Sequence, residues 1–308
     1  MRLLCCSAVF CTFLATFGLA DDSGQSDAVA HLGGQPVSKP EVELEFRRAY
    51  GPRQFTDEQR AAAWKAAVEQ VINRRLVLAY LERTGQAASS QDVDLAQAQF
   101  DKDLKAQMLT LDDHLKAVGL PLEELRRALA WKLSWNKYLE RHLTDENLQK
   151  YFDRHRREFD GTQLRVSHLL LKLPADADEA AVAAAKEKAA TFKQEIAAGK
   201  LSFAEVAQAH SQSPTGKAGG DIGWIERHQP MPEVFSSAAF ALEQGQVSEP
   251  VVSSFGVHLI TVTDAKPGQK TWQDARADLR PAVTLYLFRW IADKERAKAK
   301  VEYIDPKP

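Results

Sequence analysis

Two histidines in the second half of the chain lie on predicted strands. His168 stands in RVSHLLLK and His258 in FGVHLITV. Because side chains alternate along a strand, His168 shares a face with Val166 and Leu170, and His258 shares one with Ile260. Both imidazoles therefore point towards an apolar side, and they meet at the sheet centre if the strands are neighbours. A lone histidine in such a place is more often a hydrogen-bonded core residue than a catalyst, so the pattern alone leaves both roles open.

A glycine-rich stretch, AHSQSPTGKAGGDIGW, lies between these strands at Ala209–Trp224. A phosphate-binding P-loop needs a glycine, four further residues and then Gly-Lys-Ser/Thr. Here Ser211 stands at the position of the first glycine, and Ala218 follows Lys217. The stretch is therefore not a phosphate-binding loop, and it is either a linker or an active-site loop.

The two histidine strands enclose an α/β unit at residues 163–266. After the first strand, EAAVAAAKEKAATFKQEIAAGK predicts a helix that Gly199 ends. Ser202 and Glu205 form a capping box for the next helix, SFAEVAQAH. A short helix around Pro232 to Ala241 follows the glycine-rich stretch. The predicted order is β-α-α-loop-α-β.

The residues before this unit predict a helical region at 21–160. A Gly33-Gly34 turn between two short strands precedes helices expected at 56–83, 90–109, 111–118, 121–143 and 144–159. Residues 267–308 predict a long helix, begun by Thr271 and Asp274 and interrupted at Pro281, and an edge strand in KVEYI. The apolar face of this last helix needs a partner, and the N-terminal helices supply one.

An aromatic stripe on the helix at 121–143 has two interpretations. Trp131, Trp135 and Tyr138 follow helical spacing. Such a stripe is more often core packing between helices, which we favour, than an exposed apolar groove for unfolded chains.

The first 20 residues are typical of a secretory signal peptide. Arg2 precedes an apolar run, and small residues lead to an expected cleavage after Ala20. A membrane anchor is the weaker alternative, because the run is near the lower length limit and no basic cluster follows. A lipoprotein is weaker still. We expect a periplasmic or extracytoplasmic protein that contacts a membrane only through the signal peptide during export.

Composition excludes several kinds of site in the mature chain. The three cysteines all lie in the signal segment, so no disulfide, cysteine nucleophile or thiolate metal site is expected: Cys5, Cys6 and Cys11. The formal net charge of −2 becomes −3 when Arg2 is removed, which gives no support to nucleic-acid binding.

Four segments in series resemble the parvulin family of peptidyl-prolyl cis/trans isomerases. They are VSHLLLK, FAEVAQAHSQSPTGKAGGDIGW, MPEVFSSAAFAL and GQVSEPVVSSFGVHLI, all within 163–266. The layout of the chain, with VSKPEVELEF and TDENLQKYF, is similar to exported parvulin-like chaperones such as SurA and PrsA. The resemblance implies an α+β fold: a helical chaperone-like region and a parvulin (FKBP-like) domain, whose small antiparallel sheet is surrounded by helices. The C-terminal helix would pack back on the N-terminal region.

Prolyl isomerisation needs a particular kind of site. The barrier of about 18–20 kcal/mol comes from amide resonance, and no covalent bond is broken. A nucleophile, a metal and a cofactor are therefore not expected; an apolar pocket, polar groups that favour the twisted amide and exclusion of water suffice. The resemblance implies that the proline pocket contains Ile222, Met231 and Phe235, with Phe255 nearby.

The resemblance also implies the polar part of this site. His168 and His258 would form a hydrogen-bonded pair at the sheet centre, linked to the hydroxyl of Ser253. Ser213 completes the predicted catalytic set, in which support of the shape of the site counts as a role.

Two features depart from well-known parvulins. Ser213 occupies the position in SQSPTG that usually carries Asp or Cys, so we expect a weaker electrostatic effect and a lower isomerase activity. Lys172 is followed by the acidic run LPADADEA, which would repel a phosphate, so the expected substrates are non-phosphorylated prolyl bonds.

Three functions are compared on this basis. The leading hypothesis is an exported prolyl isomerase and folding chaperone for unfolded secreted or envelope proteins with X-Pro bonds. The alternative is a holdase chaperone with weak or no isomerase activity, which Ser213 keeps open. A serine hydrolase is disfavoured, because the chain has no Gly-X-Ser-X-Gly elbow and spacing assigns no acidic partner.

Overall fold

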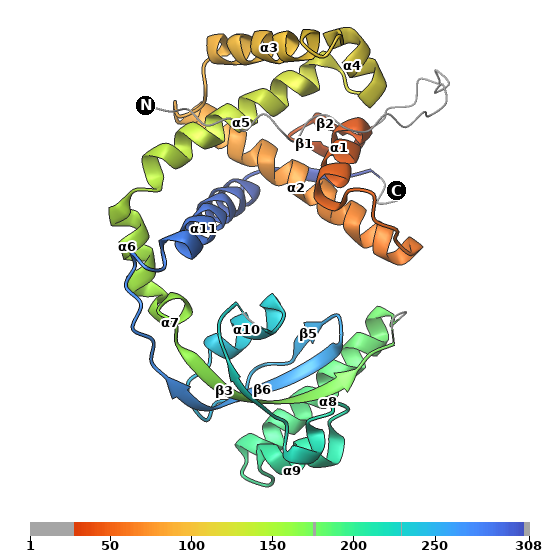
Figure 1. The fold of residues 1–308 in the computed structure, drawn as a ribbon. Helices are drawn as coiled ribbons and strands as arrows, with labels where there is room; N and C mark the ends of the chain where they lie inside the picture. The colour runs from red at the N-terminus through yellow and green to blue at the C-terminus, as the bar shows by residue number, and fades with distance from the viewer. Residues whose placement is uncertain (1–27, 175–176, 229, 305–308) are drawn as a thin grey trace. The chain divides into compact units, whose positions relative to one another are not determined.

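The computed structural model describes residues 28–174, 177–228 and 230–304 (Figure 1). The expected signal peptide and its expected cleavage site lie outside these ranges. The chain divides into two compact units. Unit one comprises the residues up to 75, residues 101–125 and the residues from 296 on, and unit two comprises 76–100 and 126–295. Within the described ranges, no helix has the length and apolar character needed to cross a membrane.

Unit one contains a small sheet of strand order β2-β1-β7. Strands β1 (Ala28–Leu32) and β2 (Gln35–Ser38) pair antiparallel, with Leu32 opposite Gln35. The connecting Gly33 and Gly34 have φ values of 57° and 82°, the left-handed conformation that a two-residue hairpin turn requires. Strand β7 (Val301–Tyr303) pairs with β1 at the edge. The predicted hairpin and the predicted edge strand are both confirmed.

The helices that precede the α/β domain agree with the predicted ones within a few residues. They are α1 (Lys39–Tyr50), α2 (Asp57–Arg83), α3 (Ser90–Lys105), α4 (Leu111–Val118), α5 (Leu122–His142), α6 (Asp145–Arg154) and α7 (Arg156–Phe159). Two predictions were wrong in detail. Helix α3 ends at Lys105 instead of residue 109, and the single helix expected at 144–159 is broken at His155, which terminates α6.

The C-terminal helix α11 (Arg276–Arg296) packs on the helices α2 and α5 of the N-terminal region, as predicted. Its Ile291 and Ala292 are buried together with Val77 and Leu81 of α2 and Tyr138 of α5. Trp131 and Trp135 pack against this cluster, which favours the core interpretation of the aromatic stripe.

Two details of α11 differ from the prediction. The Thr271–Asp274 hydrogen bonds exist, but regular helix begins at Arg276. The predicted interruption at Pro281 is wrong, because the helix continues through it. Proline removes one backbone hydrogen bond, and the buried Leu279 and Val283 hold the helix on both sides of that gap.

The α/β domain contains a four-stranded antiparallel sheet of order β4-β3-β6-β5. Its strands are β3 (Gln163–Lys172), β4 (Asp221–Ile225), β5 (Val251–Ser253) and β6 (Gly256–Lys266). The histidine strands β3 and β6 are neighbours at the centre of the sheet, which is the condition under which the two imidazoles were expected to meet. The short strands β4 and β5 were missed, and the predicted order β-α-α-loop-α-β lacks them.

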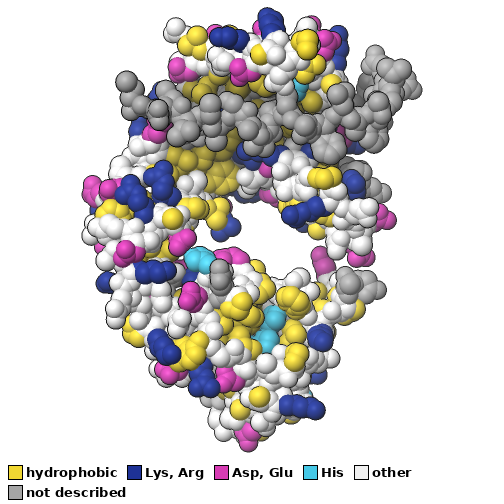
Figure 2. Space-filling model, in the orientation of Figure 1, with side chains coloured by type: hydrophobic (Ala, Val, Ile, Leu, Met, Phe, Trp, Pro, Cys, Tyr) yellow, Lys and Arg dark blue, Asp and Glu magenta, His cyan; other side chains and the backbone are white. Residues whose placement is uncertain are grey.

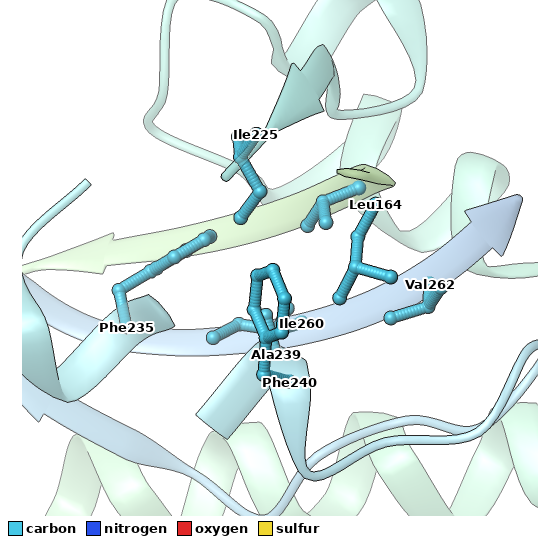
Figure 3. Close-up of a cluster of buried hydrophobic side chains, with 8 residues drawn as sticks. Leu164, Ile225, Phe235, Ala239, Phe240, Ile260 and Val262 are labelled. Atoms are coloured by element: carbon cyan, nitrogen blue, oxygen red, sulfur yellow. The ribbon is translucent and has the colours of Figure 1, made fainter. Parts of the chain in front are cut away.

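Helices cover both faces of this sheet (Figure 1). On one face, α8 (Glu179–Ala197) and α9 (Phe203–His210) bury Leu169, Leu171, Val257 and Leu259. On the other face, α10 (Glu233–Phe240) covers Leu164, Ile260 and Val262. Figure 3 shows this second cluster, in which Phe235 and Phe240 of α10 lie against the strands and Ile225 contributes from β4.

Candidate functional site

The two histidines meet at the centre of the sheet. His168 lies opposite Ile260 and His258 opposite Leu170 in the β3–β6 register, so the two imidazoles are diagonal neighbours on one face. Their Nδ1 atoms are 3.3 Å apart, and the rings are stacked with their centroids at 5.5 Å. Both side chains are buried. One Nδ1 must carry the proton and the other must accept it, so the tautomers of the two rings are coupled.

Hydroxyl groups continue the hydrogen bonds at both ends of this pair. The Nε2 atom of His258 lies 2.7 Å from Ser253 Oγ, and that of His168 lies 2.9 Å from Ser213 Oγ. Ser213 Oγ is in turn 3.1 Å from Thr215 Oγ1. We call this series of five side chains the hydroxyl–imidazole chain. It includes all four residues of the predicted catalytic set, and Thr215 is a member that the sequence analysis missed.

The glycine-rich stretch is the loop that carries Ser213. Its residue Gln212 is bound to β3, because its N–H donates to the Leu170 carbonyl (2.8 Å) and its Oε1 accepts from the Lys172 N–H (2.7 Å). The hydroxyl of Ser211 accepts from the N–H groups of Leu170 (3.1 Å) and Ser213 (3.2 Å). These contacts fix the loop to β3 beside His168. The stretch is therefore a structured part of the site instead of a linker.

A glycine at the end of this loop permits a close backbone approach. Gly220 has a φ of 84°, and its carbonyl accepts from the His168 N–H (2.9 Å). A Cβ at this position would lie 2.3 Å from the His168 carbonyl oxygen. Only glycine fits there, so this part of the loop is adapted to the histidine strand.

The apolar part of the site lies beside the histidines. Phe235 is fully buried and meets both imidazoles edge-on, at centroid distances of 5.6 Å to His168 and 5.4 Å to His258. Ile222 and Met231 are half-buried against the same cluster. Figure 2 shows histidine side chains surrounded by hydrophobic ones on this domain.

Phe255 is the fourth residue predicted to contact the substrate, and it differs from the others. Its side chain is 60% exposed on the turn between β5 and β6. Its backbone N–H donates to Ser253 Oγ (3.0 Å), so this turn is tied to the hydroxyl–imidazole chain. Phe255 is thus adjacent to the polar chain and stands outside the buried cluster.

Burial keeps both imidazoles neutral near pH 7. The pKa of His258 is lowered from 6.5 to about 4, mainly by burial and further by the neighbouring His168. Burial also lowers the pKa of His168. His258 Nε2 bonds to the Ser253 hydroxyl, but its Nδ1 faces His168 Nδ1 where a Ser-His-Asp triad would place a carboxylate, so the arrangement is unlike such a triad. A neutral chain of hydrogen bonds beside an apolar surface is suited to binding an uncharged amide.

Comparison with known protein families and relatives gives matches to the α/β domain and to longer parts of the chain. A family model described as the PPIC-type PPIase domain (rotamase) matches residues 168–264. The foldase protein PrsA of Halalkalibacterium halodurans is 30% identical over 263 residues, which are 80% of this chain and 68% of that protein. The chaperone SurA of Albidiferax ferrireducens is 39% identical over 119 residues, which are 39% of this chain and 25% of that protein.

A solved structure and two further SurA relatives are also similar to parts of the chain. The crystal structure of the peptidylprolyl isomerase PrsA from Bacillus anthracis is 23% identical and covers 75% of this chain and 96% of that chain, with a TM-score of 0.37. The chain spans from a quarter to about half of the length of the SurA relatives from Albidiferax ferrireducens, Polaromonas and Saccharophagus degradans.

Proposed function

The chain belongs to the parvulin-type foldase family that includes PrsA and SurA, and from this we propose that it isomerises X-Pro bonds in unfolded exported polypeptides. The observation that carries the proposal is the hydroxyl–imidazole chain beside Phe235. It joins a hydroxyl near an apolar surface to two neutral imidazoles, within the segment that the family model matches. We propose a location outside the cytoplasm, because the first 20 residues are typical of a signal peptide.

In the proposed mechanism, the proline ring of the substrate lies against the partly exposed Met231 and Ile222, which pack on the buried Phe235. Burial of the ring holds the prolyl bond next to Ser213 and excludes water from it. The planar amide has more negative charge on its carbonyl oxygen than the twisted amide, because resonance is lost on twisting. An oxygen lone pair of Ser213 beside that carbonyl therefore raises the energy of the planar form more than that of the transition state.

Ser213 also limits the proposed activity. A hydroxyl presents a lone pair but no full charge, so its effect on the substrate carbonyl is weaker than that of a carboxylate. We accordingly propose a moderate isomerase that acts on non-phosphorylated prolyl bonds. The acidic residues Asp178 and Glu179, which follow β3 at the start of α8, would disfavour a phosphate.

A protease-coupled assay on a prolyl tetrapeptide tests the proposal. We expect the wild-type chain to accelerate isomerisation, and His168→Ala and Met231→Ala to reduce kcat/KM by about tenfold or more, since each removes part of the site. Ser213→Asp should raise kcat/KM. A wild-type chain that suppresses aggregation of an unfolded protein but has no turnover would support the holdase alternative, and a slower Ser213→Asp enzyme would contradict the role given to Ser213.

A further inference from the structure

A buried arginine joins the site to a helix outside the matched domain. Arg227, in the turn that follows β4, is 8% exposed. Its Nη1 and Nη2 atoms donate to the two carboxylate oxygens of Glu233, at 2.8 and 2.6 Å. Its Nε atom donates to Glu158, at 3.0 Å. One guanidinium thus holds two carboxylates from different parts of the chain, in the forked geometry that arginine alone provides.

Glu233 connects this arginine to the apolar surface of the site. It is the first residue of α10, and the side chain of Pro232 before it makes no capping hydrogen bond. Met231 lies two residues before Glu233 and Phe235 two residues after it. Arg227 therefore anchors the N-terminus of α10 between these two residues of the predicted proline pocket.

Glu158 brings in α7, which precedes both the predicted domain and the matched residues 168–264. The preceding residue, Arg157, donates from Nη1 to the carbonyl of Leu242, just beyond the C-terminal end of α10. Helix α7 thus contacts α10 at one end through the Leu242 carbonyl and at the other through Arg227. We call this set of contacts the α7–α10 clasp.

The clasp extends further into the helices of unit two. Phe159, the last residue of α7, is buried in a cluster with Leu148 and Phe152 of α6 and Leu279 of α11. Its ring also meets that of His228, the residue after Arg227, at a centroid distance of 6.0 Å. A displacement of α6 or α11 would therefore move the groups that hold α10.

We propose that Arg227 is a positioning residue of the isomerase site, and that it depends on Glu158 of α7, so the helical part of unit two helps to shape the proline-binding surface. The proposal rests on the proposed function for its kinetic consequence. The domain cut at residue 163 lacks the Glu158 carboxylate, and Arg227 then keeps one of its two partners. Looser anchoring of α10 weakens binding of the proline ring equally in the ground state and in the transition state. It should therefore raise KM more than it lowers kcat.

The test uses the chain from residue 21 with four variants: Glu158→Gln, Arg227→Gln, the double variant and Glu249→Gln. The last is a matched control, because Glu249 is also a glutamate in an ion pair of the same domain, but its partner is Lys193 of α8 and not a residue of the clasp. Hydrogen–deuterium exchange of residues 231–242 reports on α10, and exchange in β3 reports on the stability of the domain. Kinetics at 10 °C separate KM from kcat.

We expect Glu158→Gln to raise exchange in α10 about tenfold and KM about three- to tenfold, with exchange in β3 unchanged. Arg227→Gln should raise both the exchange in α10 and KM to a greater extent. The double variant should have the same exchange and KM as Arg227→Gln, because Glu158 acts through Arg227. If Arg227→Gln does not fold, Arg227→Lys takes its place in the cycle.

The proposal would be overturned if α10 of the Glu158→Gln variant exchanged at the wild-type rate, or if the effects of the two substitutions added in the double variant. An equal rise in exchange in Glu249→Gln would also overturn it. A wild-type chain without isomerase activity would refute the proposed function, while the exchange data would still decide whether the clasp anchors α10.

Discussion

The stability of the isomerase domain should fall when the pH is lowered from 7 to 5, because the two central histidines are buried as neutral groups. His258 is 3% exposed, and its pKa is lowered from 6.5 to about 4. In the unfolded chain it regains its ordinary pKa. Between pH 6.5 and 4 the unfolded state therefore binds more protons than the folded state, and stability decreases as the pH decreases.

The magnitude follows from the two pKa values. The contribution of His258 is nearly complete above pH 6.5, and about 2 kcal/mol of it is lost between pH 7 and pH 5, with roughly 1 kcal/mol more lost by pH 4. The pKa of His168 is also lowered by burial, so its effect has the same sign. A loss of 2 kcal/mol corresponds to about a thirtyfold increase in the open population of the domain.

Hydrogen–deuterium exchange of the β3 and β6 amides at pH 7 and pH 5 measures this loss, after correction for the intrinsic exchange rates. His258→Gln should remove the part of the pH dependence that comes from His258, about 2 kcal/mol between pH 7 and pH 5, because the glutamine side chain does not titrate. His210→Gln is the control, since His210 is an exposed histidine at the end of α9 in the same domain. An equal pH dependence in wild type and His258→Gln would refute the reasoning.

Three further predictions concern single residues of the site. Gly220→Ala should destabilise the domain by about 2–4 kcal/mol in urea unfolding, because its Cβ would lie 2.3 Å from the His168 carbonyl oxygen, whereas Gly223→Ala, at a φ of 78° with open space around it, should lose only about 1 kcal/mol. Ser213→Asp should raise the pKa of His168, measured by NMR titration of the ring, because a carboxylate 3 Å from Nε2 stabilises the imidazolium; an unchanged pKa would contradict the 2.9 Å contact. Phe255→Ala should change stability by less than about 0.5 kcal/mol, since the ring is 60% exposed, yet raise KM for a prolyl peptide, and an unchanged KM would remove Phe255 from the site.

Sequence patterns predicted the elements that depend on local signals. The Gly33-Gly34 hairpin, the Ser202–Glu205 capping box and the histidine strands were predicted because each follows from a few neighbouring residues. The short strands β4 and β5 were missed. Strand β4 has five residues and contains a glycine, and β5 has three residues with little alternation of apolar and polar side chains, so neither shows a clear period.

The polar contacts of the site were less predictable for a different reason. The place of Thr215 in the hydroxyl–imidazole chain depends on the path of the 211–221 loop, which is fixed by hydrogen bonds of Ser211 and Gln212 to β3. The link from Arg227 to Glu158 joins residues 69 positions apart. Such contacts depend on tertiary packing, and no periodicity in a single sequence encodes them.

The coupled tautomers of the hydroxyl–imidazole chain give a physical reason for the role that we propose for position 213. The single proton between the two Nδ1 atoms makes the hydrogen bonds run in one direction at a time, from Ser253 towards Ser213 or the reverse. A carboxylate at position 213 only accepts, so it would force His168 to donate to it and would fix one direction. The Ser213 hydroxyl both donates and accepts, so either direction is open, and its lone pair faces the substrate only when its own proton is turned to His168 Nε2 or Thr215 Oγ1. In the proposed mechanism serine therefore retains the electrostatic role for part of the population, which is the physical basis for proposing a moderate activity in place of none.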